Sequence, residues 1–144
     1  MNSPKRLISL SVALICAAAL LPAAASADVE RGDYSGTTKQ AASAGAKPFS
    51  GKFGISIGIL SDPPRIFSIE LTARLSCEDG STRNVRYDEV IYGPQLDSKR
   101  RFSYSDGGLE MRGRFNTRGK AHGKFSYTVD TCSVTGATWK AASD

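Results

Sequence analysis

Apolar and polar residues alternate with a period of two along most of the chain after Pro48. In the clearest run, residues 67–77, each odd-numbered residue is apolar and each even-numbered residue is polar. A strand with one buried face has this period, because successive side chains point to opposite faces of a sheet. Similar alternation or strand-forming composition predicts further strands within residues 34–38, 51–59, 85–91, 99–105, 109–116, 120–129 and 135–141.

These segments number about eight, and turn residues separate them at intervals of roughly 8 to 12 residues. No helix pattern fits the run at residues 67–77. The pattern therefore predicts an all-β fold, a single antiparallel β-sandwich or a closed β-barrel. Residues 40–47, rich in Ala, Ser and Gly, are expected to form a flexible loop after the first strand.

Three short turns predict how neighbouring strands align, because facing residues must share one side of the sheet. A two-residue turn is expected at Asp106-Gly107, and three-residue turns that end in glycine are expected at residues 117–119 and 78–80. The registers that follow pair Tyr104 with Leu109, Phe102 with Met111, Met111 with Phe125, Leu109 with Tyr127, Leu71 with Tyr87, and Ala73 with Val85. Both residues of each pair are apolar.

The first 27 residues have the layout of a cleavable secretory signal. Lys5 and Arg6 precede an apolar run at residues 7–21, and Pro22 and the small residues 25–27 follow it. We expect cleavage after Ala27, a secreted (extracellular) protein, and one antiparallel β domain at residues 28–144. The apolar run of about 15 residues is shorter than the roughly 20 that a spanning helix needs, so no membrane anchor is expected.

Cys77 and Cys132 are the two cysteines beyond this signal. In an oxidising compartment they are expected to form a disulfide. In the chain-entropy model, closing this loop stabilises the folded protein against unfolding by about 4 kcal/mol. No closely spaced Cys and His set predicts a metal site, and no cofactor is expected. Without residues 1–27 the net charge is 17 minus 14, or +3.

Basic residues gather on the outer face of the predicted sheet over residues 99–129. The predicted registers place them in two rows: Lys99, Arg114 and His122, then Arg101, Arg112 and Lys124. Like charges opposite one another destabilise a sheet, so the cluster is either a solvated surface or a site for an anion. Phosphates of an envelope polymer and lipid headgroups are the candidate anions. No aromatic residues interleave with these cations, so no specific nucleic-acid partner is expected.

Gly113 is expected to face Gly123 on the inner side of the same sheet. Because glycine has no side chain, the two residues should leave a shallow gap there. A neighbouring aromatic residue such as Trp139 would fill that gap and so stabilise the glycines. The alternative is a cavity for a small apolar ligand inside the barrel, which would make the protein a carrier.

Evidence for catalysis is weak, and no catalytic residue is assigned. The only histidine, His122, lies among cations rather than beside an acid and a nucleophile. Glu70 and Asp88 are expected to face each other on the outer side, where Arg86 compensates them; a hydrolase built on this pair is a distant alternative. Glu89 should point inward, where it marks a strand end or bulge, or is a buried charge that needs a partner such as Arg83.

The chain resembles a loose group of small secreted bacterial β-sheet proteins of uncharacterised function. The residues that carry this resemblance are 34–37, 77–81, 112–115 with 121–125, and Cys132 followed by Thr135, Gly136 and Trp139. These are glycine, aromatic and cysteine positions, so the resemblance implies architecture and no activity. The sequence as a whole predicts a non-enzymatic secreted protein that binds an anionic envelope polymer or surface.

Overall fold

The computed structural model describes residues 29–41 and 47–144, and it contains only strands, turns and loops there. The eight strands are β1 Gly32–Gln40, β2 Phe49–Ile57, β3 Ile66–Cys77, β4 Thr82–Val90, β5 Arg101–Asp106, β6 Leu109–Phe115, β7 Lys120–Val129 and β8 Cys132–Ser143. The predicted all-β class is confirmed. The predicted signal segment, residues 1–27, lies outside the described residues.

The predicted loop at residues 40–47 begins too early, because Gln40 belongs to β1. Its side chain is buried, and its amide nitrogen donates to the backbone oxygen of Arg74 at 2.8 Å. Its amide oxygen accepts from the backbone nitrogen of the same residue, also at 2.8 Å. Gln40 thus satisfies both backbone groups of a β3 residue, which explains why a polar side chain is buried there. Residues 42–46 of the predicted loop are outside the described part.

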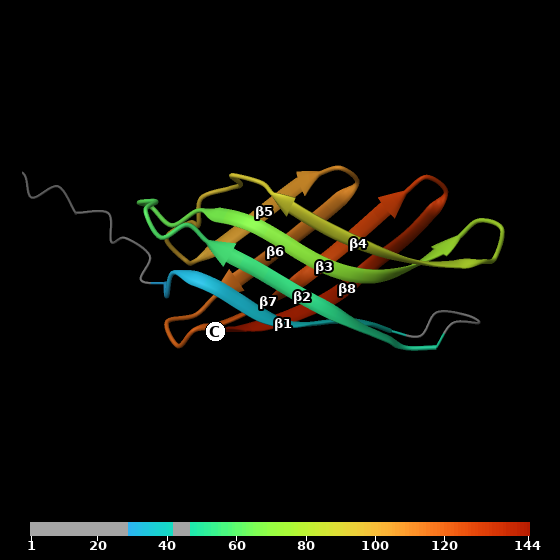
Figure 1. The fold of residues 1–144 in the computed structure, drawn as a ribbon, viewed down its shortest axis with the longest axis horizontal. Coiled ribbons are helices and arrows are strands. Elements are labelled where there is room, and N and C mark those ends of the chain that lie inside the picture. The colour runs from blue at the N-terminus through green and yellow to red at the C-terminus, as the bar shows by residue number, and fades with distance from the viewer. Residues whose placement is uncertain (1–28, 42–46) are drawn as a thin grey trace, which may run out of the picture.

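The strands form one antiparallel sheet in the order β4-β3-β2-β1-β8-β7-β6-β5. Because β3 also pairs with β8, the strands β1, β2, β3 and β8 close into a four-stranded barrel. Strand β4 extends this barrel on one side, and β7, β6 and β5 extend it on the other. Figure 1 shows the result as two layers whose strands cross, β1 to β4 over β5 to β8. The molecule therefore combines a closed barrel with the two layers of a sandwich.

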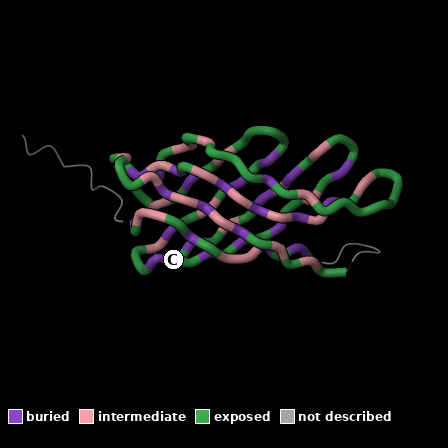
Figure 2. Tube along the Cα trace, viewed as in Figure 1, coloured by how far each residue is buried: buried purple, intermediate pink, exposed green. Residues whose placement is uncertain are grey.

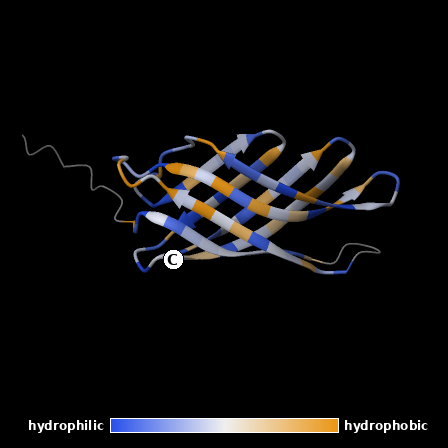
Figure 3. Cartoon of the chain, viewed as in Figure 1, coloured by the Kyte–Doolittle hydropathy of each residue, from blue (hydrophilic) through white to orange (hydrophobic). Residues whose placement is uncertain are grey.

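Burial alternates along the strands with the same period as the sequence pattern. Figure 2 shows buried and exposed residues in turn along the tubes, and Figure 3 shows the matching hydropathy. In β3, the inward-facing Ile69, Leu71, Ala73 and Leu75 are fully buried. The aromatic core between the layers includes Tyr34, which meets Phe115 edge to face at 5.0 Å between ring centroids. Burial raises the pKa of Tyr34 to about 12, and the nearby charge of Glu30 adds to this.

The two edge strands, β4 and β5, are not paired with each other in the sheet order. Their inner faces meet through Tyr87 and Tyr104, whose hydroxyl oxygens are 2.7 Å apart. Burial raises the pKa of Tyr87, and the hydrogen bond to Tyr104 raises it further. Side chains thus connect the layers where no backbone ladder does.

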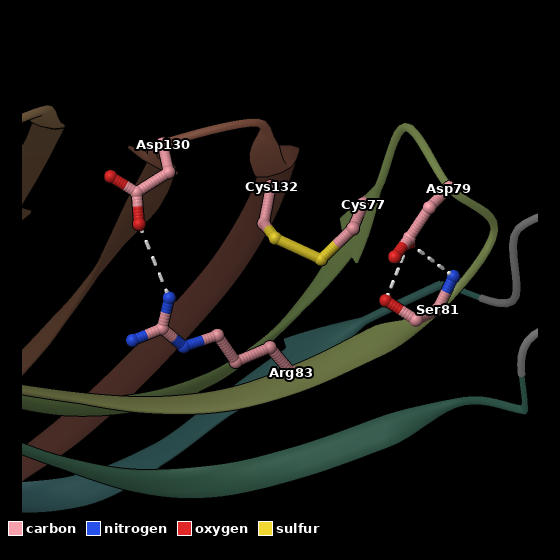
Figure 4. Close-up of a disulfide and its surroundings, with 6 residues drawn as sticks. All are labelled: Cys77, Asp79, Ser81, Arg83, Asp130 and Cys132. Carbon is pink, nitrogen blue, oxygen red and sulfur yellow. Dashed lines mark hydrogen bonds and ion pairs between the residues drawn. A yellow bond between two sulfur atoms is a disulfide. The ribbon is translucent and has the colours of Figure 1, made fainter.

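The predicted disulfide between Cys77 and Cys132 is confirmed. The two cysteines face each other across β3 and β8, next to the Ser76–Ser133 pair. Figure 4 shows the bond between the two strands and the ion pair of Arg83 with Asp130 beside it, at 3.3 Å. The disulfide therefore lies where β3 and β8 close the barrel.

Two of the three predicted hairpin registers are confirmed. The turn at residues 78–80 pairs Leu71 with Tyr87, and the turn at residues 117–119 pairs Met111 with Phe125. The second pairs of both registers also match, Ala73 with Val85 and Leu109 with Tyr127. Both turns end in a glycine with a positive φ, 82° at Gly80 and 63° at Gly119. Only glycine adopts this conformation without strain, which is why these turns could be located in the sequence.

The third predicted register is wrong, because the turn lies one residue later in the chain than predicted. Gly107 and Gly108 form the turn in place of Asp106-Gly107, with φ of 54° and 78°. Both central residues of this turn type need a positive φ, which glycine adopts with less strain than aspartate. In addition, a Cβ on Gly108 would lie 2.1 Å from the backbone oxygen of Thr128. The structure therefore pairs Tyr104 with Met111 and Phe102 with Gly113.

Trp139 fills the gap left by the facing glycines of β6 and β7, as predicted. Gly113 pairs with Gly123, and Gly123 pairs with Trp139 of β8. The indole is 2% exposed and stacks on Phe53 with ring centroids 4.4 Å apart. The space that a small apolar ligand would need at this point is therefore occupied by the protein's own side chain.

Candidate anion-binding face

Four exposed cations lie next to one another on the outer side of β6, β7 and β8. Arg112 pairs with Lys124, and Arg114 pairs with His122, both across β6 and β7. His122 in turn pairs with Lys140 of β8. We call Arg112, Arg114, Lys124 and Lys140 the cationic face. Facing residues in such a sheet have Cβ atoms about 4.5 to 5.5 Å apart, so Arg112 and Lys124 are close neighbours, whereas Arg114 and Lys140 lie on either side of His122.

The corrected β5–β6 register changes the rows that the sequence predicted. Arg101 stands opposite Arg114, and Ser103 stands opposite Arg112. Lys99 was predicted opposite Arg114, but it lies in the turn before β5. The two predicted rows are therefore wrong for Lys99 and Arg101 and confirmed for their members on β6 and β7.

The surface is hollowed over these cations. A shallow pocket of about 640 Å³ is bordered by Arg101, Arg112, Arg114, His122 and Lys124. Among the described residues, no carboxylate lies within 4.0 Å of a charged nitrogen of the cationic face. The four charges are thus left to solvent or to a bound anion.

Arg101, at the border of the pocket, is neutralised by Asp97. The guanidinium nitrogen Nη2 lies 2.8 Å from Oδ2 of Asp97. The other carboxylate oxygen accepts the backbone N–H groups of Lys99, at 2.8 Å, and of Arg101, at 2.9 Å. These bonds, first that from the Arg101 backbone, lower the pKa of Asp97. Asp97 therefore stays charged at neutral pH and competes with any other anion for Arg101.

Changing Asp97 to asparagine should raise the affinity of the protein for tripolyphosphate. The Asp97→Asn side chain keeps an oxygen for the two backbone N–H groups but loses the charge that occupies Arg101. We expect a gain of up to about fivefold at low salt, since an exposed ion pair of this kind is worth up to about 1 kcal/mol. Calorimetric titration checks this, and an unchanged affinity would show that Arg101 does not contact the anion.

The lowered pKa of Asp97 also gives a pH dependence for this turn. Its folded pKa lies below the unfolded value of about 3.9, so the turn's full contribution to stability is present above that pH. The contribution is lost as the pH falls through the folded pKa. The asparagine variant should lack this acid-sensitive contribution.

Lys140 is the member of the cationic face that sequence reasoning missed. Its position depends on the β7–β8 hairpin, for which no register was predicted. That hairpin turns at Asp130, a residue other than glycine with a φ of 53°, and its ladder has a bulge between Phe125 and Tyr127. The predicted strand within residues 135–141 includes Lys140, but without a register for this hairpin nothing placed Lys140 beside His122.

The carboxylates Glu70 and Asp88 face each other across β3 and β4, as predicted. Arg86 forms an ion pair with each of them, with Nη2 at 3.0 Å from Oε1 of Glu70 and at 2.8 Å from Oδ2 of Asp88. The predicted compensation is therefore confirmed. Glu89 is exposed near the end of the edge strand β4, so the expected strand end is confirmed and the alternative of a buried charge paired with Arg83 is wrong. Arg83 pairs with Asp130 instead, at 3.3 Å.

Residues 29–41 and 47–144 contain no group of three or more His, Cys, Asp or Glu side chains arranged to hold a metal ion. Within the same ranges, no helix has the length and apolar character needed to cross a membrane.

No family model, curated protein sequence or solved structure matches this chain. The assignment of a function therefore depends on the physical properties of the cationic face.

Proposed function

We propose that this protein is a secreted, non-catalytic binding protein whose cationic face holds a phosphate-bearing anion of the cell envelope. The observation that supports this most is the group of four adjacent cations, Arg112, Arg114, Lys124 and Lys140, without a carboxylate partner in the described chain. Export is expected from the sequence of residues 1–27, and a disulfide fits an oxidising compartment.

The electrostatic cost of this arrangement supports a bound anion. Like charges directly opposite one another destabilise a sheet, by up to about 1 kcal/mol for each pair. Arg112 and Lys124 form one such pair, and Arg114 and Lys140 flank His122 in the next row. A phosphate between the side chains removes the repulsion and accepts charge-assisted hydrogen bonds from both arginines. Binding of this kind weakens as salt is added, because ions screen exposed charges.

The two alternatives have less support. A carrier of small apolar ligands needs interior space, and Trp139 occupies the gap that glycines 113 and 123 leave. A hydrolase built on Glu70 and Asp88 needs a carboxylate free to act as acid or base, and Arg86 contacts both of them.

The test is sedimentation of the purified protein with isolated cell envelopes across a salt series. One variant neutralises the face by changing Arg112, Arg114 and Lys124 to glutamine. A matched control changes Lys47, Arg83 and Arg118 to glutamine, which lowers the net charge equally but leaves the face intact.

We expect the wild type and the control to bind envelopes at low salt and to dissociate as salt rises. The face variant should not bind at any salt concentration in the series. Equal binding of the face variant and the control would overturn the proposal, because net charge alone would then explain the association.

A further inference from the structure

The cationic face continues around the barrel as a row that crosses successive strands. Beyond Lys140 of β8, the facing residue is Thr37 of β1, and Thr37 faces Lys52 of β2. Lys52 is exposed, and no carboxylate of the described residues pairs with its ammonium group. Lys39 of β1 lies one row away, opposite Thr138. Lys52 and Lys39 thus add two charges on the far side of the β1–β8 junction.

The row ends where acidic residues begin. Lys52 donates its backbone N–H to the hydroxyl of Thr72 at 2.7 Å, and Thr72 faces Arg86. Arg86 is already bound to Glu70 and Asp88. The free cations of the row therefore run from Arg114 to Lys52 and stop there.

We propose that the ligand of this surface is a linear phosphate polymer that crosses the strands from β6 to β2. The inference rests on the proposed function and specifies its ligand. Neighbouring strands are about 4.8 Å apart, so the four steps from β6 to β2 give a path of about 19 Å along the surface. A single phosphate spans only one step. A chain of linked phosphates contacts Arg114, Lys140 and Lys52 in succession.

The curvature of the molecule favours a flexible chain over a flat lipid surface. Strand β1 pairs with β8 where the two layers join, and Figure 1 shows β2 and β6 in different layers. A bilayer that contacts Arg114 on one layer cannot also contact Lys52 on the other. A polymer bends around β1 and reaches both.

The test compares two probes, tripolyphosphate and a linear polyphosphate longer than the row. The variant changes Lys52 and Lys140 to glutamine, and a control of equal net charge changes Lys47 and Arg118 to glutamine. Affinities are measured for both probes across a salt series. Vesicles of phosphatidylcholine with phosphatidylglycerol serve as a third probe for lipid binding.

We expect the wild type and the control to bind the long polymer more tightly than tripolyphosphate. The Lys52/Lys140 variant should lose about tenfold in affinity for the long polymer at low salt. The slope of log affinity against log salt should become shallower by about 1.4, because each phosphate of a single chain that the variant no longer neutralises accounts for roughly 0.7. Its affinity for tripolyphosphate should fall by less than its affinity for the long polymer, because the variant keeps Arg112, Arg114 and Lys124 and loses only Lys140 from the cationic face.

Failure of this inference differs from failure of the proposed function. If both polyphosphates bind equally well and the Lys52/Lys140 variant matches the control, the proposed polymer path is contradicted. The proposed function of the cationic face is then still supported. If vesicles bind and neither polyphosphate does, the ligand is a lipid headgroup and the polymer is excluded. If no probe binds at low salt, both the inference and the proposed function are overturned.

Discussion

Removing the disulfide by changing Cys77 and Cys132 to alanine is expected to lower the free energy of unfolding by about 4 kcal/mol. The bond closes a loop with a sequence separation of 55 residues, and the unfolded chain gains the corresponding freedom when the bond is absent. The position of the bond adds to this expectation. The β3–β8 ladder that closes the barrel has two residue pairs, whereas β1 and β8 share six.

Guanidinium unfolding of the oxidised wild type, the reduced wild type and the double-alanine variant measures this effect. The reduced protein and the variant should unfold at similar denaturant concentrations, both well below the oxidised protein. Arg83→Gln is the matched control, because it removes the exposed ion pair with Asp130 beside the bond, which is worth at most about 1 kcal/mol. If the variant is as stable as the oxidised wild type, strand pairing alone closes the barrel.

The strands could be predicted because each has one buried face and because glycine marks several turns. Gly80 and Gly119 adopt a positive φ that other residues avoid, so these hairpins have only one favourable register. The β5–β6 turn has two glycines after an aspartate, and sequence alone allowed either of two turn positions. Contact with Thr128 of β7 selects Gly107-Gly108, and that contact is tertiary. The pairing of β3 with β8 is likewise a tertiary contact, so the sequence was compatible with both a sandwich and a barrel.

The candidate site was predictable where it depends on one hairpin. Arg112, Arg114, His122 and Lys124 lie on β6 and β7, whose register follows from the glycine at 119. Lys140 and Lys52 depend on pairings of β8 with β7 and of β1 with β2, and no short glycine turn indicates these. Sequence reasoning did not identify Asp97, because its role depends on the conformation of a turn. In that turn the backbone N–H group of Arg101 donates to the Asp97 carboxylate. Long-range pairing, rather than local pattern, thus determines the extent of the cationic row.

Changing Gly123 to alanine is expected to destabilise the protein by about 2 to 3 kcal/mol, the upper range for an overpacked site. A Cβ there would lie 2.0 Å from the backbone oxygen of Arg112 and 2.7 Å from the Trp139 ring. Neither neighbour can move easily, because one is the backbone of β6 and the other is stacked on Phe53. Gly54→Ala is the matched control, since its Cβ would meet Glu70 at an ordinary 3.6 Å.

Denaturant unfolding and tryptophan fluorescence check this expectation together, because Trp139 is the only tryptophan of the chain. Gly54→Ala should keep wild-type emission and change stability by less than about 1 kcal/mol, since alanine also restricts the unfolded chain. Gly123→Ala should shift the emission, because the indole must leave its position over glycines 113 and 123. If both variants unfold at the same denaturant concentration, the close packing of Trp139 on β6 and β7 is contradicted. The interior gap between these strands would then be open to the small apolar ligand that the carrier alternative requires.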